Sequence, residues 1–168
     1  YVAVGDAGTL LTAASGDDWQ RLPAAGHSSL RAVAFGDGVF VAVGDDGAAV
    51  RSSDGTHWEA IDTGATGTLY HVAHGGAGFV AAGGLELVVS ADGSDWTAID
   101  HGIEAGDVFP PSFQGVAYGN GNYLVRGFNG TQVVTVSKPT PNAAVNKTAA
   151  DGSTTQEVAW TVKGGEAE

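Results

Sequence analysis

Apolar and aromatic residues gather in short runs that Gly and Asp-Gly pairs interrupt. The clearest stretch has four such runs, at Leu30 to Gly36, Val39 to Asp45, Ala48 to Ser53 and Trp58 to Asp62. Gly and Asp tolerate the positive φ angles that tight β-turns need, so we expect consecutive runs to form antiparallel hairpins. No segment sustains the 3.6-residue period of an amphipathic helix. The pattern predicts an all-β protein.

The same unit recurs along the chain, and three markers recur in step. The phrase YVAVGD at residues 1–6 returns as FVAVGD at 40–45, FVAAG at 79–83 and YLVRG at 123–127. The phrase VAFG at 33–36 returns as VAHG at 72–75 and VAYG at 116–119. A third marker ends in a tryptophan, at Trp19, Trp58 and Trp96. Four antiparallel strands every ~40 residues are typical of a β-propeller blade.

The repeats divide the chain into residues 1–137, which follow the pattern, and residues 138–168, an irregular segment with one final strand. Three readings of that segment stay open. Residues 157–163 could complete the first blade and close a four-blade ring. Alternatively, residues 156–162 end a fourth blade, and the chain is an arc of a larger propeller. In the third reading, a short propeller-like piece joins another β-module.

Composition narrows the function classes. The net charge is −12, with 19 acidic and 7 basic residues, so a basic surface for nucleic acid is not available. There is no apolar run near the ~18 residues of a membrane span, so we expect no membrane insertion. Cysteine is absent, which excludes disulfides, thiolate metal sites and a cysteine nucleophile. The acidic, Gly-rich composition favours an extracellular, cell-surface or periplasmic location.

The third marker carries a family resemblance. SSDGTHW at 52–58 and SADGSDW at 90–96 resemble a compact Asp-box, also called the BNR repeat, whereas ASGDDW at 14–19 keeps only the Gly and the Trp. Asp-box propellers include sialidases, sorting-receptor propellers and photosystem assembly factors. Over residues 1 to about 137, the repeat sequence is most similar to that of uncharacterised bacterial surface or secreted repeat proteins.

Each box is interpreted as a structural turn. An Asp side chain at such a turn accepts hydrogen bonds from backbone N–H groups one or two residues later, and the Trp packs against the sheet. The resemblance implies the same, because family boxes lie at the blade periphery. The predicted turn-box residues are Asp54, Gly55, Trp58, Asp92, Gly93, Trp96 and Trp19.

A catalytic set is harder to find. Sialidases need three arginines that converge on one carboxylate, but the four arginines here fall on four different strand positions of the repeat. We therefore predict no catalytic residue, and a non-enzymatic role is favoured. No cofactor is predicted, although acidic turns such as Asp45-Asp46 are a candidate for calcium.

The connections between blades are where we expect binding, because variation on a regular scaffold usually carries function. They span residues 24–29, 63–68 and 101–112. The predicted binding-loop residues are His27, His101, Glu104, Asp107 and Phe109.

The leading hypothesis is a non-enzymatic, secreted or cell-surface propeller that binds a protein or a glycan, or serves assembly. Two alternatives remain. The chain could be a fragment of a sialidase-like glycoside hydrolase whose catalytic residues lie on other blades. It could also be a structural subunit of a surface appendage or phage particle, forming homo-oligomers by strand addition at open sheet edges.

Overall fold

The structure is a computed structural model that describes residues 1–101, 112–127, 132–137, 144–148, 154–158 and 161–166. These residues form antiparallel sheets joined by short turns, with two 3₁₀ turns, η1 (Asp6–Gly8) and η2 (Asp45–Gly47). Among them, no helix has the length and apolarity needed to cross a bilayer. The predicted all-β class and the four-stranded antiparallel blades are confirmed.

The strands fall into four successive sheets. The first holds β1 (Val2–Gly5), β2 (Thr9–Thr12) and β3 (Gln20–Arg21). The second holds β4 (Leu30–Gly36), β5 (Val39–Gly44), β6 (Ala49–Ser52) and β7 (Glu59–Ile61). The third holds β8 (His71–Gly75), β9 (Gly78–Gly83), β10 (Glu86–Ser90) and β11 (Trp96–Ala98). The fourth holds β12 (Phe113–Gly119), β13 (Asn122–Gly127), β14 (Gln132–Ser137) and β17 (Thr161–Glu166).

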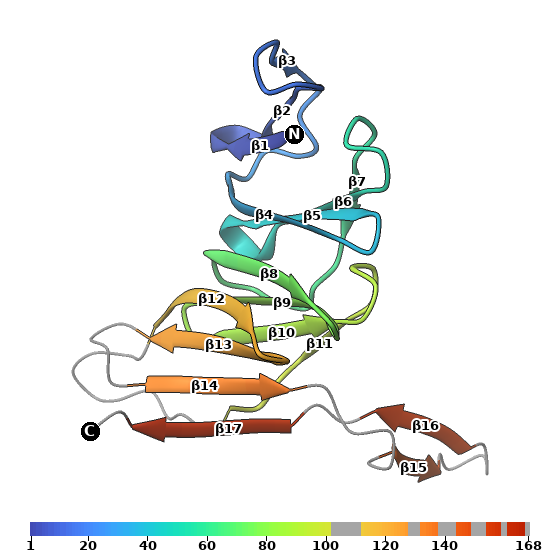
Figure 1. The fold of residues 1–168 in the computed structure, drawn as a ribbon, viewed down its shortest axis with the longest axis vertical. Helices are drawn as coiled ribbons and strands as arrows, with labels where there is room; N and C mark the ends of the chain where they lie inside the picture. Colours follow the sequence, from blue (N-terminus) through green and yellow to red (C-terminus); the bar gives the residue numbers. More distant parts are fainter. Residues whose placement is uncertain (102–111, 128–131, 138–143, 149–153, 159–160, 167–168) are drawn as a thin grey trace.

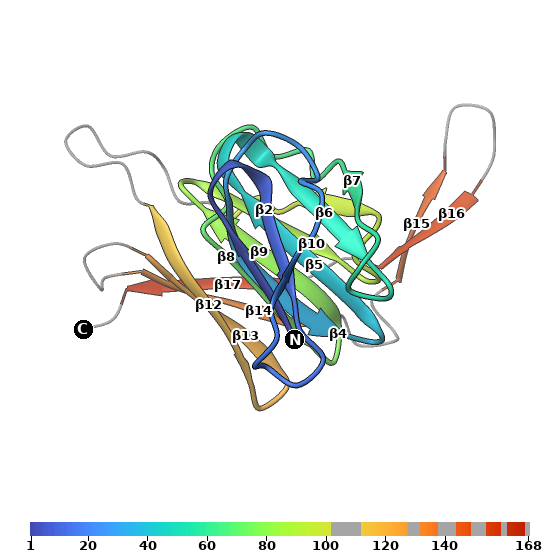
Figure 2. The ribbon, with the colours of Figure 1, turned by 90° about the horizontal axis from the view of Figure 1, so that it is seen from above.

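The last strand settles the three readings of the C-terminal segment in part. β17 pairs with β14, from Ser137 opposite Thr161 to Gln132 opposite Glu166. The reading in which residues 157–163 complete the first sheet is therefore wrong, and so is the placement of the last strand at 156–162. An additional hairpin, β15 (Ala144–Thr148) and β16 (Thr154–Val158), extends sideways from the fourth sheet (Figures 1 and 2).

The sheets lie one above another, and the first and fourth stand at opposite ends of the stack (Figure 1). The chain thus forms an arc of stacked blades in which the first strands β4, β8 and β12 contact one another in succession. The view from above shows the blades turning steadily relative to each other, as twisted sheets do (Figure 2).

The core consists of three apolar layers, one between each pair of neighbouring sheets. Alternation along the middle strands supplies both sides of each layer, because successive side chains of a strand point to opposite faces. In β9, for example, Phe79 and Ala81 pack toward the second sheet, and Val80 and Ala82 pack toward the fourth. All four are fully buried. A strand that is buried on both faces explains the continuous apolar run in the sequence.

Neighbouring blades also interlock through glycines. A β-carbon on Gly36 would lie 2.0 Å from the ring of His74 in the next sheet. A β-carbon on Gly75 would lie 2.2 Å from the ring of Tyr118 in the sheet after that. In the first two of the three VAFG-type phrases, the Gly therefore contacts the ring of an aromatic residue from the following blade. This contact explains why those two copies need glycine.

Candidate functional site

The turn between β6 and β7 is organised by one carboxylate. Asp54 Oδ1 accepts the N–H groups of Thr56 at 2.7 Å and His57 at 2.8 Å. It also accepts the hydroxyl of Ser52 at 3.1 Å, and that hydroxyl oxygen in turn accepts the Gly55 N–H at 2.8 Å. The second carboxylate oxygen lies 2.7 Å from His57 Nδ1. The side chain of Asp54 is thereby committed to holding the turn.

The turn between β10 and β11 repeats this geometry. Asp92 Oδ1 accepts the N–H of Ser94 at 2.8 Å, and the Ser90 hydroxyl accepts the Gly93 N–H at 2.8 Å. Gly93 has a φ of 81°, which a residue with a β-carbon adopts only with strain. The half-buried Trp96 donates its indole N–H to the Gly93 carbonyl at 3.2 Å.

Hydrogen bonding also sets the acidity of both carboxyls. The backbone N–H of His57, followed by its ring and by the Thr56 N–H, lowers the pKa of Asp54 far below its ordinary range. The Ser94 N–H is the main cause that lowers the pKa of Asp92, against partial burial that raises it. Both groups therefore stay ionised at neutral pH and are unsuited to general acid–base work.

The corresponding turn in the first sheet is built differently. Ala13 stands where the other turns have the serine, and Ser15 stands where they have the aspartate. Gly16 keeps a positive φ of 89°. Trp19 is 43% exposed, whereas Trp58 is half-buried against the layer between the first two sheets.

The opposite end of the blades, which we call the loop face, carries η1, η2 and the connections between sheets. Here the Glu86 carboxylate closes the connection at 63–68. It accepts the Thr66 N–H at 2.9 Å, the Thr66 hydroxyl at 3.0 Å and the Gly67 N–H at 3.0 Å. Beside this clamp lies a cavity of about 430 Å³ that Ser112 and Gly84 also line.

The predicted loop residues are distributed over this face. His27 is exposed in the connection between the first and second sheets. His101 follows the third sheet, where its Nε2 lies 2.7 Å from the Leu85 carbonyl and its ring meets Phe113 edge-on at 5.0 Å. The two histidines thus occupy different levels of the stack. The remaining predicted loop residues, Glu104, Asp107 and Phe109, lie outside the described residues.

Three of the four arginines each have an acceptor of their own. Arg31 donates hydrogen bonds to the Asp45 carboxylate from Nε at 2.8 Å and from Nη2 at 2.5 Å. This pairing raises the pKa of Arg31. Arg51 Nη1 lies 3.3 Å from Glu59 Oε1, and Arg21 donates to Thr9 at 3.2 Å. Within the described residues these three side chains do not share a ligand.

Metal-ligating groups are also dispersed. In the part of the chain that the structure describes, no three His, Asp or Glu side chains come together in a way that could hold a metal ion. The acidic pair Asp45-Asp46 lies in η2, with Asp45 engaged by Arg31.

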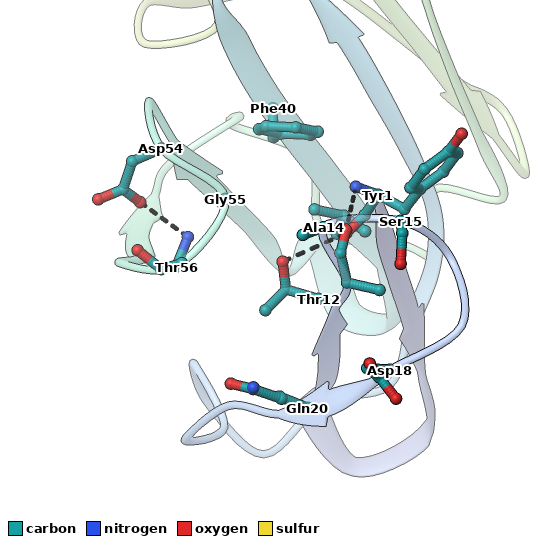
Figure 3. A pocket seen from close by; sticks show the side chains of 12 residues that line it. Tyr1, Thr12, Ala14, Ser15, Asp18, Gln20, Phe40, Asp54, Gly55 and Thr56 are labelled. Carbon is teal, nitrogen blue, oxygen red and sulfur yellow. Dashed lines mark hydrogen bonds between the residues drawn. The ribbon is translucent and has the colours of Figure 1, made fainter.

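A second cavity, about 530 Å³ in volume, opens between the turns of the first and second sheets. Thr12, Asp18 and Gln20 line it from the first sheet, and Phe40 and Asp54 line it from the second (Figure 3). The repeat pattern does not predict this cavity; it predicts Asp54 as a residue of the turn alone.

The comparisons with known proteins agree with this architecture. A family model described as the DUF6242 beta propeller domain matches residues 1–161. No curated protein and no solved structure matches the chain.

Proposed function

The chain belongs to the DUF6242 β-propeller family, and from that premise we propose that it is a non-enzymatic binding or assembly module that engages a protein or glycan through its loop face. The observation that carries this proposal is the Glu86 clamp. A carboxylate that orders the 63–68 connection beside a cavity of about 430 Å³ provides a fixed, concave surface, mainly apolar, on which Thr66, Glu86 and Ser112 place polar groups. Small-ligand pockets fall within ~300–1,000 Å³.

Repeated and variable residues serve different purposes, and this difference supports the same role. Repeated positions such as Gly36, Gly75 and Phe79 pack one blade on the next. The connections differ from blade to blade and bear the polar groups. A regular scaffold with variable loops is the usual arrangement of a binding protein.

We also assign the turns at 52–58 and 90–96 to the Asp-box type. The Ser52 and Asp54 hydrogen bonds, matched by those of Ser90 and Asp92, support this assignment because the carboxylates serve the turn rather than a ligand. The proposal extends to a secreted or cell-surface location, which the acidic, Gly-rich composition favours.

The loop-face proposal is tested by screening the protein on an array of immobilised glycans and against a displayed peptide library. Each ligand found is then titrated against Glu86→Gln and, as matched control, Glu59→Gln, which lies in β7 outside the loop face. We expect E86Q to weaken binding and E59Q to leave it unchanged, because only E86Q loosens the clamp. A ligand whose binding is equally insensitive to both changes contradicts the proposal, as does turnover of glycoside reporters by the wild-type protein.

A further inference from the structure

The cavity between the first two sheets occupies a position that the next repeat fills with an arginine. Thr12 on β2 pairs with Val2 on β1, and Arg51 on β6 pairs with Val41 on β5. The two positions are 39 residues apart, which is the repeat interval. Thr12 and Arg51 are therefore the same position in successive blades, and both face the blade that follows, as their neighbours Leu10 and Ala49 do.

Arg51 lies largely covered between the second and third sheets, with its side chain 23% exposed and its Nε fully buried. Its Nη1 reaches Glu59 on the adjacent outer strand at 3.3 Å. Its charge also acts on the next turn: after the Ser94 N–H and the other local hydrogen bonds, it contributes to the lowered pKa of Asp92. One internal arginine thus fills the groove between two turn boxes.

In the preceding groove the same place is open. Thr12 ends at its hydroxyl, which is turned back to the Tyr1 carbonyl at 3.2 Å. Beyond it lies the cavity of about 530 Å³, with Asp54 of the next turn on one side and Asp18 on the other (Figure 3). Phe40 offers an aromatic face above these carboxylates (Figure 3). None of the side chains that line this cavity is cationic, and the amino group of Tyr1 is engaged by the Ala13 carbonyl at 2.7 Å.

We propose that this cavity binds an arginine side chain of a protein partner, in the place that Arg51 occupies one blade later. The inference rests on the proposed function as a binding module, but it puts a second site at the opposite end of the blades from the loop face. A guanidinium is planar, weakly hydrated and stacks on aromatic rings, so it fits a groove that combines Phe40 with two carboxylates. Its aliphatic stem would cover the apolar wall.

Asp18 is the residue on which charge recognition rests. Asp54 is engaged by its own turn, whereas Asp18 is exposed and, within the described residues, has no hydrogen-bond or ion-pair partner. A fork of N–H donors can therefore bond to it without displacing a structural contact. The net charge of −12 adds long-range attraction for a cationic segment.

The test uses a fluorescein-labelled peptide with one arginine between Gly and Ser residues, titrated by fluorescence anisotropy. Matched peptides carry lysine or citrulline, the neutral isostere of arginine, at the same position. We expect the arginine peptide to bind about two- to fivefold more tightly than the citrulline peptide, because the latter cannot form the ionic contact with the exposed Asp18. Equal binding of citrulline or of lysine would overturn the proposal, as would failure of the arginine peptide to saturate at millimolar concentration.

Variants locate the site. Thr12→Arg supplies the missing side chain from within the chain, as Arg51 does, and is expected to reduce peptide binding at least about tenfold. Asp18→Asn is expected to weaken it several-fold. The control Thr97→Arg adds the same charge at an exposed strand position on the third sheet and should leave binding within about twofold. If T12R and T97R weaken peptide binding equally, net charge alone is responsible and the proposal is refuted.

Two further results separate this inference from the loop-face function. Thermal unfolding of T12R verifies that the variant is folded, and D18N, a change at an exposed side chain, gives an independent reading. Peptide binding that survives Glu86→Gln but not T12R supports this site whether or not a loop-face ligand exists. Peptide binding lost in E86Q and kept in T12R assigns the peptide to the loop face and refutes the inference.

Discussion

The close contact of the Tyr118 ring with Gly75 allows a direct test of how the blades are held together. Gly75→Ala would place a β-carbon 2.2 Å from Cδ2 and 2.4 Å from Cγ of Tyr118, far inside normal contact distance. The φ of Gly75 is not in the left-handed region, so alanine meets no backbone penalty there. The three atoms nearest to the added carbon all belong to the Tyr118 ring of the next blade.

Two opposing effects then decide whether G75A raises or lowers the free energy of unfolding. Replacing glycine by alanine at a compatible backbone position stabilises a protein by about 0.4–1 kcal/mol through the unfolded state. Overpacking costs about 1–3 kcal/mol. Tyr118 could swing outward, but it would lose its contact with Tyr123, whose ring centre lies 4.8 Å away. Such aromatic pairs contribute about 0.5–1.5 kcal/mol. We expect a net loss of about 1–2 kcal/mol for G75A.

Removal of the ring should reverse the sign. In the Tyr118→Ala background, G75A has space and is expected to stabilise by about 0.5 kcal/mol, which gives a coupling energy of about 1.5–2.5 kcal/mol. Urea unfolding followed by tryptophan fluorescence and circular dichroism measures all four variants. The matched control is Gly119→Ala, at the same repeat position in β12, where nothing lies within 4 Å of the added carbon. A G75A cost that persists in the Y118A background, or that G119A shares, would refute the reasoning.

Three further predictions concern the turns and a buried hydroxyl. Ser52→Ala removes the acceptor of the buried Gly55 N–H and should lower the free energy of unfolding by about 1–3 kcal/mol in urea titrations. Ala13→Ser combined with Ser15→Asp should build the missing turn hydrogen bonds in the first sheet and raise that free energy by about 1 kcal/mol. Burial raises the pKa of Tyr123 to about 12, so stability should fall by about 2 kcal/mol between pH 10 and 12, and Tyr123→Phe should abolish that fall.

The sign of the alkaline effect follows from proton binding. Between pH 10 and 12 the unfolded chain has lost the phenolic proton, whereas folded Tyr123, whose hydroxyl donates to the Gly78 carbonyl at 2.6 Å, retains it. The stability that this proton provides is complete below pH 10 and lost above 12. Controls are Tyr118→Phe for the pH series and the exposed Ser53→Ala for the turn series. A slope that survives Y123F, or an S53A cost equal to that of S52A, would contradict these assignments.

Local turn chemistry made most of the fold predictable. The expected run from Leu30 to Gly36 is β4 to the residue, and the run from Val39 to Asp45 exceeds β5 by one residue. Both end at glycine-rich turns, where Asp37 and Gly38 adopt the positive φ angles that those residue types favour.

The C-terminal strand and the contacts of the loop face were harder to predict from the sequence. β17 joins β14 across an intervening hairpin, and pairing over such a distance leaves no local signature. The Glu86 clamp joins residues about twenty positions apart, so spacing alone did not reveal it. The cavity beside Thr12 did leave a signal, because the repeat aligns this threonine with Arg51, but its meaning depended on knowing which face of β2 meets the second sheet.

Function in a chain of near-identical blades should be sought where one copy departs from the others. A single repeat position faces each of the three interfaces between sheets, and a different residue occupies it at each one. Val89 is 1% exposed and completes an apolar layer between the third and fourth sheets. Arg51 fills the groove between the second and third sheets with an internal cation. Thr12 leaves the first groove open beside two carboxylates. Because stability alone is served by filling a groove, as valine and arginine do, the open copy is the one whose shape favours an occupant from outside the chain.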